Sequence, residues 1–436
     1  MVNVSIISKK TIKPLSPTPS TQRLHKLSLV DQVVSHSYIP LVFFYTKHQV
    51  ATIPNGSKQL SQLLANSLSK TLTCYYPWAG SLKDNATIEC DDHGAEFFEV
   101  QINSPMDKIV YHPDSRIKDL TFPQGTLWGS CIGRASTVAQ LSHFECGGIA
   151  LSVCVSHKVG DGCSAYYFLR DWAALTRNPN AKLAPCFVED SLIPSPFDGP
   201  LVFPLVDSKP EECIQKRFVF SASKIRALKA LVAHESGVTN PTRNEVVNAL
   251  LYKCAVSAND NSGSFKPSQL IQCSNLRASM SPPLPPTSIG NILTVFSTPI
   301  YHEEQDLKLP KLVADIRKSK DNLSGRNNVE QNELVSEMLD AYRNGEAPYQ
   351  QRNCDVYTNT SFLGFEFEKL DFGWGKPARG SIASGPANKI FILMNTPDRR
   401  GVEAFVNLNE QDMSVFENYK DLLQFATPIE QAHDLL

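Results

Sequence analysis

The sequence lacks an excess of charge of either sign. Its 436 residues include 42 lysines and arginines and 44 aspartates and glutamates, so the formal net charge is -2. Proteins that bind nucleic acids usually carry a basic excess or a basic stripe, and this chain has neither. The balance therefore argues against a nucleic-acid partner and favours a globular protein that handles small molecules.

A long apolar run is also missing. No stretch reaches the roughly 18 apolar residues that identify a membrane helix. The N-terminal segment MVNVSIISKKTIKPLSPTPS has no apolar run of signal-peptide length and no small-residue cleavage site. We therefore expect no membrane association, and the cytosol is the default compartment.

The eleven cysteines follow no metal-binding or disulfide pattern. No CxxC pair occurs, and pairs such as Cys146 and Cys154 are too far apart for a zinc knuckle. Cysteines in a reducing compartment are mostly free thiols. We expect free thiols and no metal site.

Strand-like and helix-like segments alternate through both halves of the chain, which predicts an α/β fold with mixed β-sheets. A proline-rich segment with little periodicity, residues 179–214, interrupts them and has the composition of a crossover. We therefore predict two domains, residues 1–178 and residues 215–436. The expected elements include helices over 60–72, 164–176, 223–234, 310–323 and 329–342, a hairpin over 139–157, a capping box at Thr242 and Glu245, and strands around 362–370, 389–395 and 402–408.

Several common catalytic motifs can be dismissed. Asp371-Phe372-Gly373 has the letters of a kinase motif, but the glycine-rich loop, the lysine and the catalytic loop of a kinase are absent upstream. The sequence has no phosphate-binding P-loop, no GxGxxG and no GxSxG nucleophile elbow. Kinase, dinucleotide-dependent and serine-hydrolase chemistry are therefore disfavoured.

The element HKVGDG (157–162) stands directly after a predicted strand and before a predicted helix. A rigid strand followed by a turn is a common place for an active-site residue. The imidazole of His157 titrates near working pH, so it can take a proton from an alcohol or amine that attacks an electrophile. No nucleophilic serine or metal cluster accompanies it, which favours attack on an activated donor such as a thioester. Taken alone, the element also fits a structural histidine.

Several segments together resemble the plant BAHD acyltransferases, which use coenzyme A thioesters. HKVGDG is similar to the HxxxDG element of that family, and DFGWG (371–375) is similar to its second signature. The SPTP near the N-terminus, the Ser-His-Lys form of the histidine element and SMSPPLP resemble its alkaloid O-acetyltransferases, which include vinorine synthase. Further similar segments are LSLVDQ (27–32), YPWAG (76–80), ECGG (145–148) and NLRASMSPPLPPTSIGN (275–291).

The resemblance implies two chloramphenicol-acetyltransferase-like domains with His157 in a solvent channel between them. It implies a single-step reaction, in which His157 deprotonates the acceptor hydroxyl and the oxygen attacks the thioester. Asp161 is implied to point away and to pair with Arg277, so we assign it a structural role; a catalytic His–Asp dyad is the alternative. The resemblance likewise implies a structural role for the DFGWG residues Asp371, Gly373, Trp374 and Gly375.

One position departs from the family pattern. Before DFGWG the group usually has Thr-Ser-Trp, whose hydroxyl and indole N–H can stabilise an oxyanion, whereas this chain has Thr360-Ser361-Phe362. Phe362 has no N–H to donate. Thr360 is therefore our oxyanion candidate, and a slow enzyme or a changed chemistry is the alternative.

The co-substrate and the acceptor are expected only in outline. The resemblance favours acetyl-CoA, a hydroxyl of a plant alkaloid or related metabolite, no permanently bound cofactor and a monomer. Lys253 and Ser274 are our candidates for binding coenzyme A. A malonyl donor would need a cation, and Arg399 and Arg400 cannot be placed from sequence. An aromatic acyl donor and a family member that binds ligands without catalysis are further alternatives.

Overall fold

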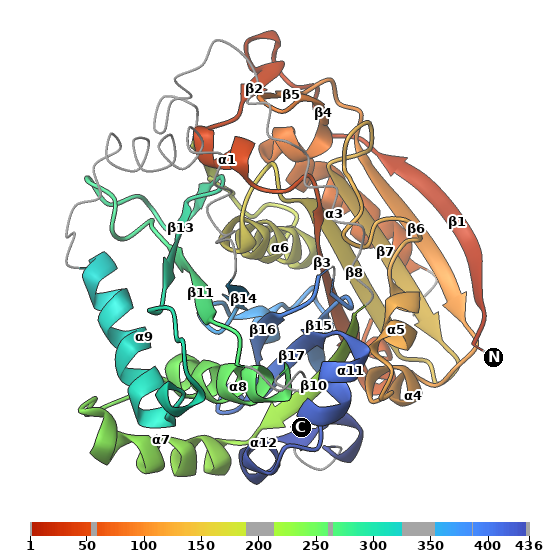
Figure 1. The fold of residues 1–436 in the computed structure, drawn as a ribbon. Helices are drawn as coiled ribbons and strands as arrows, with labels where there is room; N and C mark the ends of the chain where they lie inside the picture. The colour runs from red at the N-terminus through yellow and green to blue at the C-terminus, as the bar shows by residue number, and fades with distance from the viewer. Residues whose placement is uncertain are drawn as a thin grey trace.

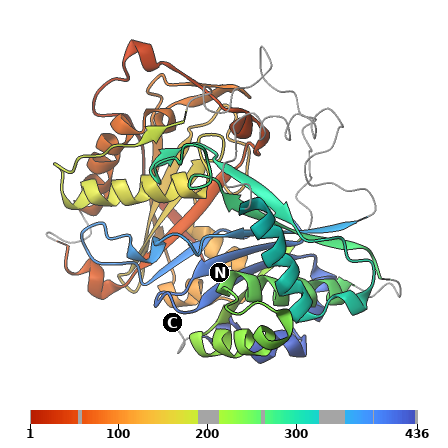
Figure 2. The same cartoon turned by 90° about the vertical axis from the view of Figure 1, so that its left-hand side faces the viewer.

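The protein is described by a computed structural model that covers residues 2–53, 59–188, 213–259, 265–324, 354–385 and 387–432. Two large β-sheets with packed helices form its two halves, and helix α6 (Gly162–Arg177) lies between them (Figures 1 and 2). The predicted α/β class is therefore confirmed. Within these ranges, no helix has both the length and the apolar character needed to cross a membrane.

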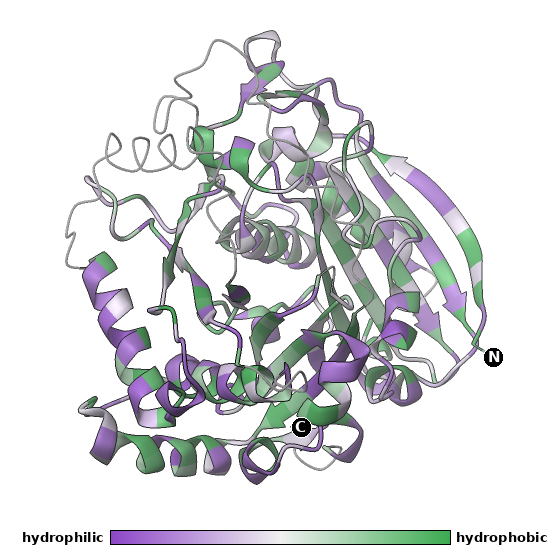
Figure 3. Cartoon of the chain, in the orientation of Figure 1, coloured by the Kyte–Doolittle hydropathy of each residue, from purple (hydrophilic) through white to green (hydrophobic). Residues whose placement is uncertain are grey.

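The first sheet has six strands, and its central strands are the most buried part of the fold. All eight residues of β3 and of β8 are buried, as expected for strands covered on both faces. The edge strand β1 instead is mostly exposed and carries both hydrophilic and hydrophobic residues (Figure 3). The strand order is β1 (Val4–Ile12), β6 (Ala95–Ile102), β7 (Thr137–Phe144), β8 (Ile149–Ser156), β3 (Tyr38–Tyr45) and β15 (Arg379–Ile382).

Helices α3 (Leu60–Cys74) and α6 pack against each other on this half. The leucine spacing of α3 explains its orientation, because Leu60, Leu64, Leu68 and Leu72 are fully buried in the core while Leu63 is 37% exposed. These side chains join the same core as strands of the first sheet. The predicted amphipathic helix is therefore confirmed.

The second sheet has seven strands and a separate core. Its helices α7 (Ala222–Ser236), α8 (Arg243–Asn259) and α9 (Leu309–Ser324) pack on one another, and α11 (Glu410–Phe416) and α12 (Lys420–Phe425) lie against α8 (Figure 1). The strand order is β13 (Leu293–Ser297), β11 (Ser268–Asn275), β14 (Asp355–Ser361), β16 (Ile390–Asn395), β17 (Val402–Leu408), β10 (Ile214–Phe220) and β18 (Thr427–Pro428).

Short elements complete the described chain. One small sheet has the order β2 (Leu24–Lys26), β5 (Thr87–Glu89) and β4 (Ser81–Asp84), and β9 (Cys186–Phe187) pairs with β12 (Ser288–Ile289). The short helices are α1 (Leu29–Val33), α2 (Lys47–Val50), α4 (Met106–Val110) and α5 (Ser115–Lys118). The 3-10 turns are Ser20–Gln22, Tyr76–Ala79, Asp119–Thr121, Glu304–Asp306, Phe367–Lys369 and Ile429–Gln431.

The C-terminal part of the chain contributes a strand to the first sheet. β15 belongs to the C-terminal part of the sequence but pairs antiparallel with β3 at the edge of the first sheet. The DFGWG segment, which we placed in the C-terminal domain, packs into the core of the first half. A division at residues 178 and 215 therefore does not follow the two sheets, because residues 379–382 cross back. Most of the predicted crossover, residues 189–212, lies outside the described residues.

Most of the other expected elements are found. The helices over 164–176, 223–234 and 310–323 correspond to α6, α7 and α9, and the hairpin corresponds to β7 and β8. The capping box before α8 is present: Glu245 N donates to Thr242 Oγ1 at 3.2 Å, and Thr242 N to Glu245 Oε2 at 2.7 Å. All eleven cysteines are free. The helix over 329–342 lies outside the described residues.

The strand predicted around residues 362–370 is wrong. β14 ends at Ser361, and the chain then turns and forms the 3-10 turn Phe367–Lys369. The apolar residues that suggested a strand are Phe362, Phe365 and Phe367, whose rings pack against one another with centroids 5.7–6.2 Å apart. Their burial comes from ring packing in a turn rather than from strand pairing.

Candidate active site

His157 lies where the two halves meet. It follows directly after β8, and its backbone N–H donates to Ser37 O at 2.9 Å. Burial lowers the pKa of His157, because the imidazolium would lose its hydration, and Asp161 and Asn291 oppose this shift only in part. The neutral imidazole, which accepts a proton, is therefore the favoured form at neutral pH.

Asp161 forms the expected ion pair with Arg277. The guanidinium binds both carboxylate oxygens, at 2.8 and 2.9 Å, and both side chains are buried. Burial alone would raise the pKa of Asp161, but the charge and hydrogen bonds of Arg277 lower it below its usual value. The carboxylate is therefore held ionised and directed toward Arg277.

Asp161 also begins helix α6. Its Oδ1 accepts from Ser164 N at 2.9 Å, which caps the helix, and its Oδ2 accepts from Ile292 N at 3.2 Å. Arg277 extends this network by donating to Ser288 O at 3.0 Å and Gly290 O at 3.1 Å. The hydrogen bonds of the Asp161 carboxylate go to these groups and not to the ring of His157. This geometry favours the structural reading over a His–Asp dyad.

Asn291 was not among our candidates, yet it contacts His157 directly. Its Nδ2 donates to His157 O at 2.7 Å and to Asp31 Oδ1 at 2.8 Å, and its backbone N–H donates to the same Asp31 oxygen at 2.7 Å. Asp31 lies on α1. The segments LSLVDQ and SIGN contain these two residues, so the family resemblance marked the segments without showing that they meet.

The end of β14 faces the start of α6. The hydroxyl of Thr360 lies 3.9 Å from Cys273 Sγ on β11. The ring of Phe362 lies against Gly162, so closely that a Cβ on this glycine would come within 2.6 Å of Phe362 Cε1. The structure thus places the predicted oxyanion segment of the second half next to the helix that follows His157.

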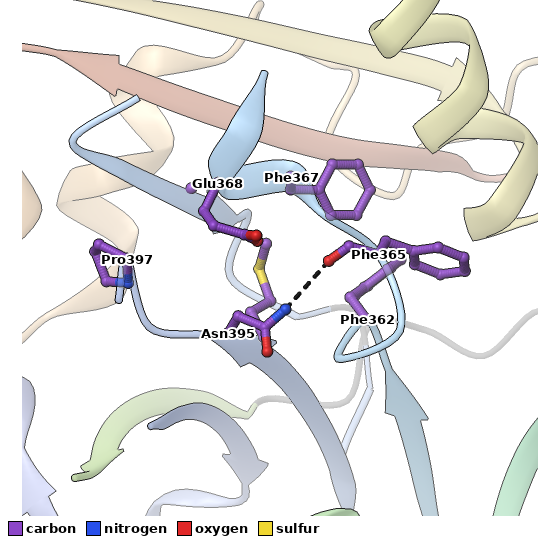
Figure 4. A pocket seen from close by; sticks show the side chains of 8 residues that line it. Phe362, Phe365, Phe367, Glu368, Asn395 and Pro397 are labelled. Carbon is purple, nitrogen blue, oxygen red and sulfur yellow. Dashed lines mark hydrogen bonds between the residues drawn. The ribbon is translucent and has the colours of Figure 1, made fainter. Parts of the chain in front are cut away.

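A small pocket lies behind Phe362 (Figure 4). Asn395 closes one side, where its amide donates to Phe365 O at 3.1 Å. The volume is about 10 Å³, which is room for about one water molecule, so this pocket does not accommodate an acyl chain. Its lining residues are Phe362, Phe365, Phe367, Glu368, Gly380, Met394, Asn395 and Pro397.

The DFGWG segment forms a tight turn away from His157. Asp371 Oδ1 accepts from the backbone N–H groups of Gly373 at 2.8 Å and Gly375 at 2.9 Å, and both glycines have positive φ, at 117° and 99°. Trp374 is buried between the rings of Tyr45 and Phe372.

The position of this turn follows from its contact with α6. Arg177, the last residue of α6, donates to Asp371 O. His157 precedes the other end of that helix, and a helix of this length spans about 24 Å. The turn therefore lies too far from His157 to take part in proton transfer.

The two coenzyme A candidates lie in different surroundings. Lys253 on α8 pairs with Asp421 on α12 at 2.6 Å, so it is not a free cation. Ser274 is half-buried on β11, three residues before Arg277 and next to Cys273. Ser274 thus lies near the site, whereas Lys253 is engaged on the helical layer of the second half.

Arg399 and Arg400 are also paired. They lie in the turn between β16 and β17, where Arg399 contacts Glu366 and Glu368, the latter at 2.9 Å. Arg400 contacts Asp398 at 3.0 Å. Both guanidinium groups therefore already have carboxylate partners in the chain.

Comparison with known proteins agrees with this architecture. A model of the Transferase family matches residues 2–423. The acyltransferase Pun1 of Capsicum frutescens is 44% identical, covering 97% of this chain and 98% of its own. A 17,18-epoxy-17-hydroxycur-19-ene N-malonyltransferase of Strychnos nux-vomica is 40% identical, covering 98% and 92%. The crystal structure of vinorine synthase matches with a TM-score of 0.82 at 29% identity, covering 98% and 100%. The chain therefore belongs to this transferase family, the plant BAHD acyltransferases, which use acyl-CoA as co-substrate.

Proposed function

We propose that the protein is a CoA-dependent O-acyltransferase that transfers an acetyl group to a hydroxyl of a plant alkaloid or a related specialised metabolite. The observation that carries this proposal is the place of His157. It follows a rigid strand at the junction of the two halves, and its lowered pKa keeps the imidazole neutral and able to accept a proton.

The acyl group passes directly from the bound donor to the bound acceptor. His157 takes the proton of the acceptor hydroxyl, and the oxygen attacks the carbonyl carbon of the thioester. The C–S bond of the tetrahedral intermediate then breaks, and the protonated His157 returns its proton to the sulfur as CoA leaves. No acyl-enzyme forms, because His157 acts as a base rather than as a nucleophile.

The negative oxygen of the intermediate needs a hydrogen-bond donor. Thr360 lies at the end of β14 with its hydroxyl near Cys273, and Phe362 offers no donor. We assign the role to Thr360. Removing one such donor usually costs about 3–4 kcal/mol of transition-state stabilisation.

A malonyl donor is the second candidate. It is favoured by the name of the Strychnos relative, an N-malonyltransferase that is 40% identical. It is disfavoured by the pairing of Arg399 and Arg400 with carboxylates, because a malonyl group would need an unpaired cation for its distal carboxylate. Acetyl-CoA therefore remains the proposed donor.

A screen of acyl donors tests the proposal. Acetyl-, malonyl-, benzoyl- and coumaroyl-CoA are each incubated with a panel of hydroxylated plant alkaloids, and products are detected by mass spectrometry. Acetylated product is expected. Malonylated product alone would support the second candidate, and binding without any turnover would support a non-catalytic family member.

The same assay tests the base. His157→Ala should keep the fold and lose turnover by orders of magnitude. His143→Ala is the matched control, because His143 is half-buried and pairs with Glu99 on the neighbouring strand. Near-normal turnover by His157→Ala would contradict the mechanism. The cytosolic location and the monomeric state stay predictions, testable by fractionation and by size-exclusion chromatography.

A further inference from the structure

Helix α1 belongs to the first half by sequence, but its apolar face packs on the second half. Leu29 and Val30 are buried in a small core of their own, and Leu293 on β13 packs against it. Figure 1 shows the helix close to β13. The other buried residues of this core are Val188, Leu276, Met280 and Ile292. The helix therefore bridges the two halves.

A buried lysine of the first half holds the C-terminal end of α1. Lys158 directly follows His157 and is fully buried. Its Nζ donates to Asp31 O at 3.1 Å, Gln32 O at 2.9 Å and Asn85 Oδ1 at 2.7 Å. Because the last carbonyl groups of a helix have no N–H partner within the helix, the ammonium group supplies the missing donors. All three of its N–H bonds are thereby used.

The same helix is fixed to its surroundings on two further sides. Asn85, in the turn between β4 and β5, donates from Nδ2 to Gln32 O at 3.1 Å. The carboxylate of Asp31 accepts from the backbone N–H of Asn291, in the second half, at 2.7 Å. The amide of Asn291 in turn contacts His157 O. Helix α1 is thus tied to both halves directly beside His157.

The partners of Lys158 show what this residue provides. Two are carbonyl oxygens and one is an amide oxygen, so no carboxylate is among its hydrogen-bond partners. Burial lowers the pKa of Lys158 from 10.5 to about 8, so the group is charged at neutral pH but poorly compensated. Lys158 is therefore a poor source of stability, whereas three acceptors in three directions fix its Nζ and the helix end bound to it.

We propose that Lys158 is a positioning residue for acyl transfer, whose ammonium group seats α1 across the junction of the halves and so sets their spacing at His157. The proposal rests on the base role proposed above for His157. The acceptor and the thioester must meet at this base, and a misplacement of about 1 Å can cost about 100-fold in rate. Loss of the ammonium group should therefore lower kcat more than it raises KM.

The first test compares Lys158→Met with Lys118→Met, using the substrates identified in the donor screen. Lys118 is the matched control, because it is equally buried and also donates to a backbone carbonyl, but contacts β15 and β10 instead of α1. Lys158→Met should lower kcat about 100-fold and change the KM for acetyl-CoA much less. The control should keep its kcat. An unchanged kcat in Lys158→Met, or an equal loss in the control, would overturn the proposal.

The second test restores the missing donors chemically. Lys158→Ala leaves three oxygens without their ammonium partner, and methylammonium chloride supplies a small cation with N–H groups. This salt should recover part of the lost kcat. Tetramethylammonium chloride at the same concentration has the charge but no N–H group, so it should recover none. Equal effects of the two salts would overturn the proposal.

The third test reads the seat of α1 without any substrate. Hydrogen exchange followed by mass spectrometry should be faster in Lys158→Met for peptides that cover residues 28–34 and 290–292, and unchanged there in Lys118→Met. Unchanged exchange of residues 28–34 in Lys158→Met would overturn the proposal. If His157→Ala itself retained turnover, the proposed function would fail, and hydrogen exchange would still decide whether Lys158 seats α1.

Discussion

Asp161 shows how a residue four positions from the base serves it through the fold. Its carboxylate caps α6 and binds Arg277, which reaches the segment of residues 288–291. The start of α6, β12 and the turn that contains Asn291 are thereby tied together beside His157. Loss of activity on changing Asp161 is consequently expected from loss of geometry rather than from loss of a proton carrier.

The free energy of unfolding should reveal the structural role of Asp161. Asp161→Ala leaves Arg277 buried and unpaired, which usually costs about 3–5 kcal/mol. We expect a loss of this size in the free energy of unfolding, measured by urea denaturation. The double variant with Arg277→Ala should lose less than the sum of the two single variants, because the pair is lost only once. Unchanged stability with lost activity would favour the catalytic dyad instead.

The lowered pKa of His157 leads to a second prediction. Burial lowers its pKa below the ordinary value of 6.5, so the neutral base persists on the acid side of neutrality. The acid-side midpoint of kcat/KM should therefore lie below pH 6.5. An initial-rate series from pH 5 to pH 9 with saturating donor measures it. A midpoint above 6.5 would show that the imidazolium is stabilised in the donor-bound enzyme.

Helix α6 connects the site to the rest of the molecule at the scale of a single element. Its first residue, Gly162, touches the ring of Phe362, and its last residue, Arg177, binds the DFGWG turn. One helix thereby sets the distance between the two signatures of the family. The residue at its start must be small because a ring from the other half occupies the space of a side chain.

This packing predicts that substitutions at Gly162 and Phe362 partly compensate each other in their effect on stability. Gly162→Ala adds a methyl group within 2.6 Å of the Phe362 ring, and overpacking of this kind usually costs about 1–3 kcal/mol. Gly162→Ala should therefore lower the melting temperature. Combining it with Phe362→Leu should recover part of the loss, which differential scanning calorimetry measures. Additive losses in the double variant would mean that the two residues do not share this space.

The sequence predicted elements better than it predicted contacts. Helix α3 follows from five leucines at helical spacing, residues 60, 63, 64, 68 and 72. The capping box before α8 follows from Thr242 and Glu245 alone. The strand predicted at 362–370 was wrong because closely spaced phenylalanines, at 362, 365 and 367, occur both in strands and in a turn that packs its rings. Local periodicity records which residues are buried but not what covers them.

At the scale of the whole molecule, the site is assembled from distant segments. Asn291 is 134 residues from His157 along the chain, and Asp31 is 260 residues from Asn291. The pairing of Asp161 with Arg277 was expected only through the family resemblance. No spacing rule on one sequence brings such residues together, because sheet order and helix packing decide their distance.

Lys118 contacts both halves of the molecule, and its protonation should make the stability of the fold depend on pH. Its Nζ donates to Ile382 O on β15 and lies 3.4 Å from Gln215 Oε1 on β10. Burial and the nearby charge of Arg217 lower its pKa from 10.5 to about 7. Between these values the unfolded chain binds more protons than the folded one, so stability should rise as pH rises through this window.

Lys118→Met removes the titrating group. It should therefore reduce the rise of the free energy of unfolding with pH. Urea denaturation of both proteins from pH 7 to pH 10 measures it. Lys311→Met is the control, because Lys311 is 47% exposed and its loss should leave the slope unchanged. Parallel curves for the unmodified protein and Lys118→Met would show that Lys118 is ionised to the same degree in both states.

Strand β15 has a consequence for synthesis of the protein. Residues 41–44 of β3 pair with residues 379–382, and β3 is apolar and buried throughout. A ribosome adds about 5–20 residues per second, so β3 leaves the exit tunnel well before its partner has been translated. During that interval the first sheet has an open apolar edge, the kind of surface on which nascent chains stick to one another. We therefore expect the first sheet to gain its last strand only near the end of translation, and an N-terminal fragment cut between the halves to keep this edge open.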